Sequence, residues 1–147
     1  MNAGSAPCSP RRGFLAAAAV LAGAALFAYA PPAFAGTYLN RAVLLLTGAA
    51  RDAAYLRPRF SDKELARVVQ RVMQARLDAA NAMTVPKEVV QAHPHLLLVL
   101  EHYIQAAEAA TRGEAERFVQ YHQRALDEER AFRVVLKQLG WVLPDGA

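Results

Sequence analysis

From residue 38 onward, apolar residues recur every three or four positions, which is the period of an amphipathic α-helix. This pattern predicts four helices, over residues 38–56, 61–83, 94–111 and 114–139. No stretch of this part alternates with the period of a half-buried β-strand. Isolated amphipathic helices are marginal in water, so each apolar stripe must be buried against the others. We therefore expect an all-α fold, an antiparallel four-helix bundle with short connections.

The predicted inward faces are mostly aliphatic and aromatic. They comprise Leu65, Val68, Val69, Val72, Met73, Ala79 and Ala80 in the second helix, Leu96, Leu100, Tyr103, Ala107 and Ala110 in the third, and Phe118, His122, Ala125, Glu129, Phe132, Leu136 and Leu139 in the fourth. His122 and Glu129 are the polar exceptions. A buried glutamate is costly without a partner, so Glu129 should either pair with an arginine of a neighbouring helix or rotate outward.

Local signals mark the ends of the predicted helices. Ser61 and Glu64 have the spacing of a capping box, whose side chains satisfy free backbone N–H groups at a helix start. His93 is expected to cap the third helix, with Pro94 in the first helical position, where a missing N–H group matters least. Gly113 suits the left-handed position that ends a helix. These signals predict short connections between the helices.

The first 35 residues contain the three parts of a cleavable signal peptide. The basic part leads directly into aromatic and aliphatic residues, in the run Arg11, Arg12, Gly13, Phe14 and Leu15. An apolar stretch covers residues 13–30, and Ala33 and Ala35 form a small-x-small site ahead of Gly36. The run from Arg11 to Leu15 resembles a bacterial twin-arginine export signal. Pro10 departs from the Ser or Thr that is usual in that pattern, which leaves the general secretory route open.

This resemblance implies a chain in two parts. Residues 1–35 would be a signal peptide that the export machinery recognises and that is removed after Ala35, and residues 36–147 would be the helical domain. The protein is then expected in the periplasm or outside the cell. The alternative is an uncleaved signal, in which case residues 13–30 would anchor the protein in the inner membrane.

Charge and cysteine content exclude several classes of function. The 147 residues include 17 Lys and Arg against 13 Asp and Glu, and removal of Arg11 and Arg12 leaves a net charge of only +2. So small an excess gives no basic patch of the kind that binds nucleic acid. The single cysteine, Cys8, lies in the signal segment, so the helical domain has neither a disulfide nor a cysteine metal site.

No sequence motif of catalysis is present, and we expect a protein without enzymatic activity. The candidate site residues are His102, His122 and Glu129. His102 lies eleven residues before Gly113 and His122 nine residues after it, so the two histidines should lie level across an antiparallel helix pair. They could then bind a metal ion or a non-covalent haem. The alternative, which is the commoner arrangement, is one hydrogen-bonded core histidine and one exposed histidine.

Two alanine-rich stretches resemble the second half of small periplasmic b-type cytochrome bundles. They are residues 77–80, Leu-Asp-Ala-Ala, and residues 106–114, Ala-Ala-Glu-Ala-Ala-Thr-Arg-Gly-Glu. The resemblance implies a four-helix architecture. The haem ligands of that family do not carry over, because the first predicted helix has no methionine and no histidine follows His122.

The leading functional hypothesis is a binding or protein-interaction role in the bacterial envelope. Leu44, Leu45 and Leu46 are apolar around most of the first helix, and residues 96–100 are apolar around the third. Such helices expose leucine in an isolated bundle, which indicates an envelope protein partner or a homodimer. Deep burial of these leucines inside the bundle explains the pattern equally well. The alternative hypothesis is a bundle that binds a metal ion or non-covalent haem, and acid–base catalysis by His122 and Glu129 is the weakest reading.

Overall fold

Helices account for most of the chain that the computed structural model describes, residues 33–143, with side chains from residue 36 onward. The elements are α1 (Ala33–Leu56), the 3-10 helix η1 (Arg57–Arg59), α2 (Lys63–Asn81), the 3-10 helix η2 (Lys87–Val89), α3 (His93–Arg112) and α4 (Ala115–Gln138). No strand occurs within residues 33–143. The expected all-α, four-helix fold is therefore confirmed for this part of the chain.

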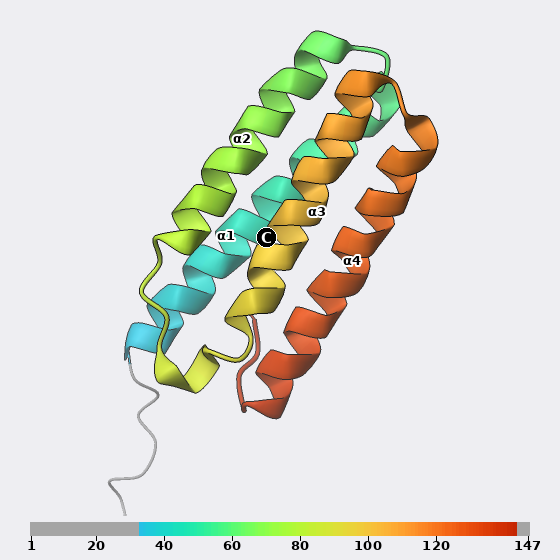
Figure 1. Ribbon diagram of the computed structural model, residues 1–147. Helices are drawn as coiled ribbons and strands as arrows, with labels where there is room; N and C mark the ends of the chain where they lie inside the picture. The colour runs from blue at the N-terminus through green and yellow to red at the C-terminus, as the bar shows by residue number, and fades with distance from the viewer. Residues whose placement is uncertain (1–32, 144–147) are drawn as a thin grey trace, which may run out of the picture. The chain divides into compact units, whose positions relative to one another are not determined.

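The four helices lie side by side, and each runs opposite to the one before it in the chain (Figure 1). Helix α3 packs against α1, α2 and α4, and α1 also packs against α2. Because α1 and α3 run in the same direction, the contact between them is a parallel one. Helix α3 is accordingly the central helix, and it carries the largest share of the buried residues.

The predicted inward face of α3 is correct: Leu96, Leu100, Tyr103, Ala107 and Ala110 are all buried. In α4, the predicted apolar positions Phe118, Ala125, Phe132 and Leu136 are buried as well. His122 and Glu129 are half-buried, at the edge of the same face. Polar side chains stay at such an edge because full burial would remove the water that solvates them.

The inward face of α2 is narrower than its sequence predicts. Val69, Met73 and Ala80 are buried, whereas Val68 and Val72 are exposed. A helix that packs against neighbours on one side buries a stripe of limited width, and these two valines lie beyond the edge of that stripe.

The capping prediction for α2 was wrong by one residue. The cap is Asp62, whose carboxylate accepts a hydrogen bond of 2.9 Å from the backbone N–H of Leu65, and Ser61 is exposed. Aspartate and serine cap helices about equally well, so the sequence alone does not choose between adjacent candidates.

The predicted cap of α3 was also wrong, while its predicted end is correct. His93 is the first residue of α3, and Ala92 precedes it without a side-chain cap. The imidazole of His93 instead forms a hydrogen bond of 3.1 Å with the hydroxyl of Tyr38, from α1. Gly113 ends the helix with a φ of +76°, a left-handed conformation that glycine adopts without strain.

Helix α1 begins earlier than predicted. Ala33 and Ala35 lie in its first turn, so the predicted small-x-small site is helical. Arg11, Arg12, Phe14 and Leu15 lie outside the described residues, as does the apolar stretch 13–30. None of the helices within residues 33–143 has the length and apolar character needed to cross a membrane.

Candidate functional site

A polar aromatic contact lies between α3 and α4, where Tyr103 meets His122. Their rings pack edge to face, with centroids 5.8 Å apart, and the ring of Phe118 lies 6.0 Å from that of His122. Tyr103 is only 1% exposed. Burial raises the pKa of its hydroxyl to about 12, and the negative charge of Glu129 acts in the same direction. The hydroxyl is therefore protonated at any physiological pH.

His122 is held in a partly dehydrated environment. Burial lowers the pKa of its imidazole below the ordinary value, and the positive charge of Arg57, in η1, lowers it further. The imidazole is consequently neutral at neutral pH, with one ring nitrogen able to accept a hydrogen bond or a metal ion.

Glu129 finds its partner on its own helix. Arg133, one turn further along α4, donates to Oε1 of Glu129 from Nη2 at 2.7 Å and from Nε at 3.2 Å. The carboxylate side chain is 18% exposed, whereas that of Arg133 is 48% exposed. Of the two predicted outcomes, pairing with an arginine of a neighbouring helix was wrong. Glu129 lies at the edge of the inward face and pairs with an arginine four positions away on its own helix.

The hydroxyl of Tyr103 has no hydrogen-bond partner among the described residues. A buried polar group in this state loses its hydration without compensation. Tyr103 thus contacts His122 and lies near enough to Glu129 to be affected by its charge. Among the described residues, its hydroxyl is not part of a hydrogen-bonded chain of the kind that general acid–base catalysis uses.

His102 and His122 have different partners in the structure. Nδ1 of His102 lies 3.2 Å from Oε1 of Gln105, on its own helix, while His122 contacts Tyr103 and Phe118. One position along a helix is a rotation of about 100°, so the neighbour Tyr103 occupies the place opposite His122. In residues 33–143 no group of three or more His, Cys, Asp or Glu side chains is arranged to hold a metal ion.

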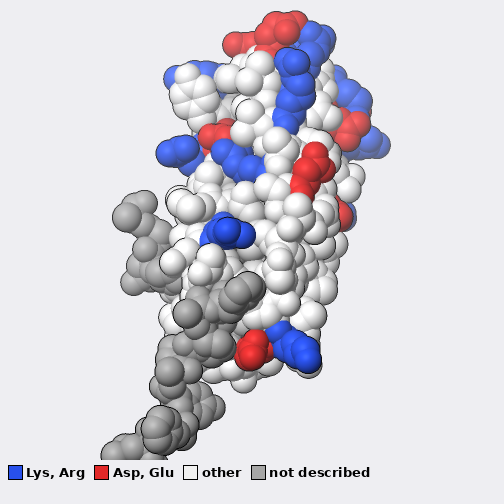
Figure 2. All heavy atoms as spheres, turned by 90° about the vertical axis from the view of Figure 1, so that its left-hand side faces the viewer, with Lys and Arg blue, Asp and Glu red and all other residues white. Residues whose placement is uncertain are grey.

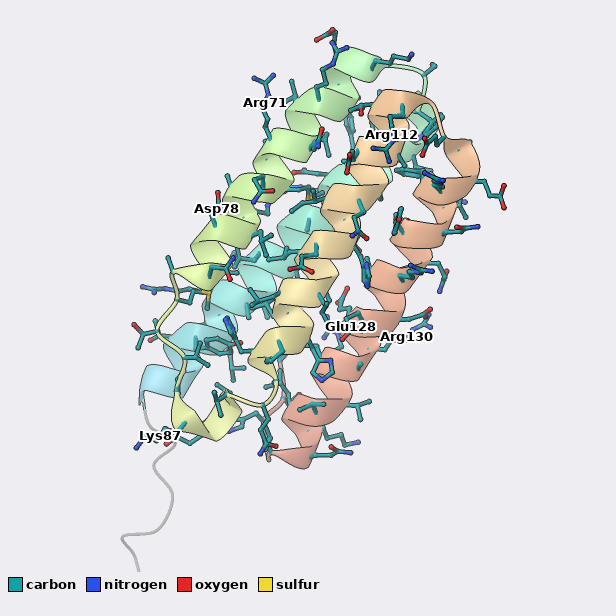
Figure 3. The ribbon with its side chains drawn as sticks, viewed as in Figure 1. Arg71, Asp78, Lys87, Arg112, Glu128 and Arg130 are labelled. Carbon is teal, nitrogen blue, oxygen red and sulfur yellow. The ribbon has the colours of Figure 1, made fainter. Side chains whose placement is uncertain are left out.

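Two further histidines make interhelical contacts that the sequence did not indicate. His95 of α3 and Glu128 of α4 form a pair with Nδ1 and Oε1 2.5 Å apart, and both side chains are half-buried. Figure 3 shows Glu128 on the side of α4 that faces α3. His95 and Glu128 are 33 residues apart in the chain, and Tyr38 and His93 are 55 apart. At such separations only the register of the packed helices identifies the partners.

A second feature is an apolar surface along α1 and α2. Its members are Leu44 and Leu45 from α1, with Val68, Val72, Ala75 and Ala79 from α2 and Ala82 and Met83 just after it; we call this surface the α1–α2 face. Leu44 is 73% exposed, Val68 48% and Val72 39%. Figure 2 views the side on which α2 lies in Figure 1, and its charged side chains gather mainly at the upper end.

Part of the α1–α2 face is hollowed. A shallow groove of about 450 Å³ lies between the two helices, lined by Arg41, Leu44, Leu45, Ala79, Ala82 and Met83. Beside it, Arg76 of α2 forms an ion pair of 2.7 Å with Asp52 of α1. Gly48 allows this approach, because a Cβ atom there would lie 3.0 Å from the guanidinium of Arg76. The α1–α2 contact is therefore fixed by a partly buried ion pair next to an open apolar groove.

Comparisons with known proteins identify no family for this chain. A scan of protein-family models, a search of curated proteins and a search of solved structures each found no match. Function must accordingly be inferred from the residues themselves, and the two features available are the Tyr103–His122 contact and the α1–α2 face.

Proposed function

We propose that this protein is an exported helical-bundle protein of the bacterial envelope that acts without catalysis, by binding a protein partner through the α1–α2 face. The single observation that supports this most is the exposure of Leu44, Val68 and Val72 on neighbouring elements. Burial of apolar surface is worth about 25 cal/mol per Å², so a partner that covers these side chains gains binding energy without any new polar contact. Single exposed leucines are ordinary, but Leu44 and Leu45 line one groove together with apolar residues of α2, and such a gathering is typical of an interaction surface.

The groove between α1 and α2 supports the same proposal. Its lining combines aliphatic side chains with one arginine, Arg41, which forms no ion pair or hydrogen bond within residues 33–143. Apolar grooves are typical of sites that receive the apolar face of an amphipathic helix.

Crosslinking from chosen positions tests the partner. A photo-reactive amino acid at position 44 should give a crosslinked species in intact cells, whereas the same group at Val134 should give none. Val134 is a matched control because it is an exposed aliphatic residue on α4, away from the α1–α2 face. Equal crosslinking from both positions, or none from position 44, would contradict the proposal.

Export is part of the proposal, and the run Arg11-Arg12 supports it. Replacement of both arginines by lysine should retain the chain in the cytoplasm if the twin-arginine route is used, and cell fractionation measures this directly. Normal export of that variant would favour the general secretory route. Recovery of the full-length chain in the inner membrane would instead favour an anchor formed by residues 13–30.

The alternative of a metal ion or non-covalent haem at His102 and His122 has no comparable support. The ring of His102 is engaged with Gln105, and that of His122 packs between aromatic rings. We therefore do not propose a cofactor.

A further inference from the structure

The exposed stripe of α2 has the spacing of a coiled-coil seam. Its members follow one another at intervals of three, four, three, four and three residues: Leu65, Val68, Val72, Ala75, Ala79 and Ala82. This is the heptad pattern of a and d positions. Leu65 is half-buried and the other five are exposed, whereas the bundle core uses a different set: Ala66, Val69, Met73 and Ala80. Helix α2 therefore carries two apolar stripes. Leu65 packs against the edge of the core, and the other five members of the second stripe are exposed.

Two charged residues flank this seam on one side. Arg71 and Asp78 each precede an a position, seven residues apart, and both side chains project away from the bundle (Figure 3). Arg71 forms no ion pair within residues 33–143, and Asp78 accepts one hydrogen bond, from the amide of Gln74 at 3.0 Å. Residues at such flanking positions set the partner and the orientation of a coiled coil.

We infer that the partner of this seam is α2 of a second copy of the chain, packed antiparallel about a two-fold axis. The inference deepens the proposed function and rests on it, because it names the occupant of the α1–α2 face. In a two-fold interface, a contact between residue i and residue j of the partner is matched by the reverse contact. A self-complementary surface must therefore supply both halves of every contact.

The volumes of the seam residues fit this arrangement. An axis that passes between Met73 and Gln74 places Val72 opposite Ala75 of the partner subunit and Val68 opposite Ala79 of the partner subunit. Each layer then combines a large residue with a small one, which lets the two helices approach closely and interdigitate.

The charges fit the same axis. Arg71 then lies level with residue 76 of the partner subunit, and Asp78 of the partner subunit lies two residues, about 3 Å, further along. Arg71 and Asp78 both precede an a position, so a long arginine side chain reaches this carboxylate, and the contact occurs twice because of the symmetry. A parallel pairing would instead place Arg71 beside Arg76 of the partner subunit, whose guanidinium already pairs with Asp52, so Arg71 would find no acidic partner. Charge therefore favours the antiparallel dimer, and no second kind of chain is needed to complete the seam.

Charge reversal tests the inference by sedimentation equilibrium on the full chain, expressed with its own N-terminal segment. The unmodified protein should dimerise. Arg71→Asp alone and Asp78→Arg alone should each weaken the dimer by about tenfold or more, since like charges then face each other twice. An equimolar mixture of the two variants should restore dimerisation, because one chain then presents two acidic residues to two basic residues of the other.

Matched controls separate the seam from a general effect of charge. Lys87→Asp and Glu101→Arg make the same changes of charge at exposed positions outside the seam, and they should leave dimerisation unchanged. A monomeric wild-type chain at every accessible concentration would overturn the inference, as would a mixture no better than its components. The proposed function fails separately, if a photo-crosslinker at position 44 captures no protein at all. Capture of a different protein beside a monomeric chain would keep the proposed function and reject the dimer.

Discussion

Two buried tyrosines differ in what their hydroxyl groups contact. The hydroxyl of Tyr38 lies 3.1 Å from Nδ1 of His93, which joins α1 to the start of α3. The hydroxyl of Tyr103 has no partner among the described residues, although its ring packs against His122. The hydroxyl of Tyr38 therefore stabilises a contact between helices, whereas that of Tyr103 is a buried polar group without a partner.

Removal of each hydroxyl should have opposite effects. Tyr38→Phe should lower the free energy of unfolding by about 1 kcal/mol, because the ring nitrogen of His93 loses its partner. Tyr103→Phe should leave that energy unchanged or raise it by up to about 1 kcal/mol, because an unsatisfied buried group is removed while the ring remains. Urea unfolding of the two variants measures both values. Destabilisation of the Tyr103 variant as large as that of the Tyr38 variant would contradict the assignment of its hydroxyl.

Histidine protonation should make stability depend on pH. Burial lowers the pKa of both His93 and His122 in the folded chain, with Arg57 adding to the effect at His122. The unfolded chain, with a histidine pKa of about 6.5, then binds protons at a higher pH than the folded chain does. The free energy of unfolding should therefore be highest above about pH 6.5, and it should fall as the pH decreases toward the histidine pKa values of the folded chain.

Unfolding experiments between about pH 7.5 and about pH 5.5 measure how the free energy of unfolding changes with pH, in a range where most carboxylates stay ionised. A variant with both His93→Gln and His122→Gln should show a flatter profile, whatever its absolute stability. An unchanged slope would show that neither histidine is responsible.

At the scale of the element, the start of α2 distinguishes two adjacent candidates for a cap. Asp62→Ala should lower the free energy of unfolding by about 1 kcal/mol, because the N–H of Leu65 loses its acceptor. Ser61→Ala, one residue earlier, should change it by less than about 0.5 kcal/mol, because Ser61 is exposed and makes no cap. Thermal or urea unfolding of this pair checks the observed helix start, and the reverse order of effects would restore the cap that the capping box predicts.

The same helix shows what an apolar pattern does and does not determine. Both stripes of α2 read as candidate core, since valine and alanine recur at helical spacing in each. Only the packing of α2 against α1 and α3 decides which stripe is buried. In that rotation Arg76 reaches Asp52 of α1, and Val68 and Val72 are left exposed.

At the scale of the whole molecule, the core is continuous across all four helices and includes Leu143, beyond the end of α4. Phe132 lies fully buried within it. Phe132→Ala should lower the free energy of unfolding by about 3–5 kcal/mol, a large part of the stability of a domain of this size. Val134→Ala, two residues away and exposed, should change it by less than about 0.5 kcal/mol. Calorimetry of both variants tests this, and comparable losses would contradict the orientation of α4.

Much of the fold follows from local physics. The period of the apolar residues predicts four helices. The start of α1 differs from the prediction by five residues, its end agrees, and the other bounds differ by one or two residues. Gly113 ends α3 as predicted, because few other residues adopt a positive φ without strain. The inward face of α3 is also correct, since a central helix buries its whole apolar stripe.

The candidate site followed from the sequence only in part. Counting residues from Gly113 places His102 and His122 at similar heights, and that height needs no tertiary information. The rotation of each helix about its own axis is set by packing, and it turns Tyr103, not His102, toward His122. The pairing of His95 with Glu128 depends on the same rotation and register.

The sequence by itself determined the helical class, the approximate bounds of the helices and the apolar character of their faces, because these depend on neighbours within a few positions. Only the tertiary structure decided which faces are buried, which polar groups find partners and which apolar stripe stays open. Those outcomes depend on the rotation and register of the helices. Many weak contacts across the whole core together select that rotation and register, and no local pattern encodes them.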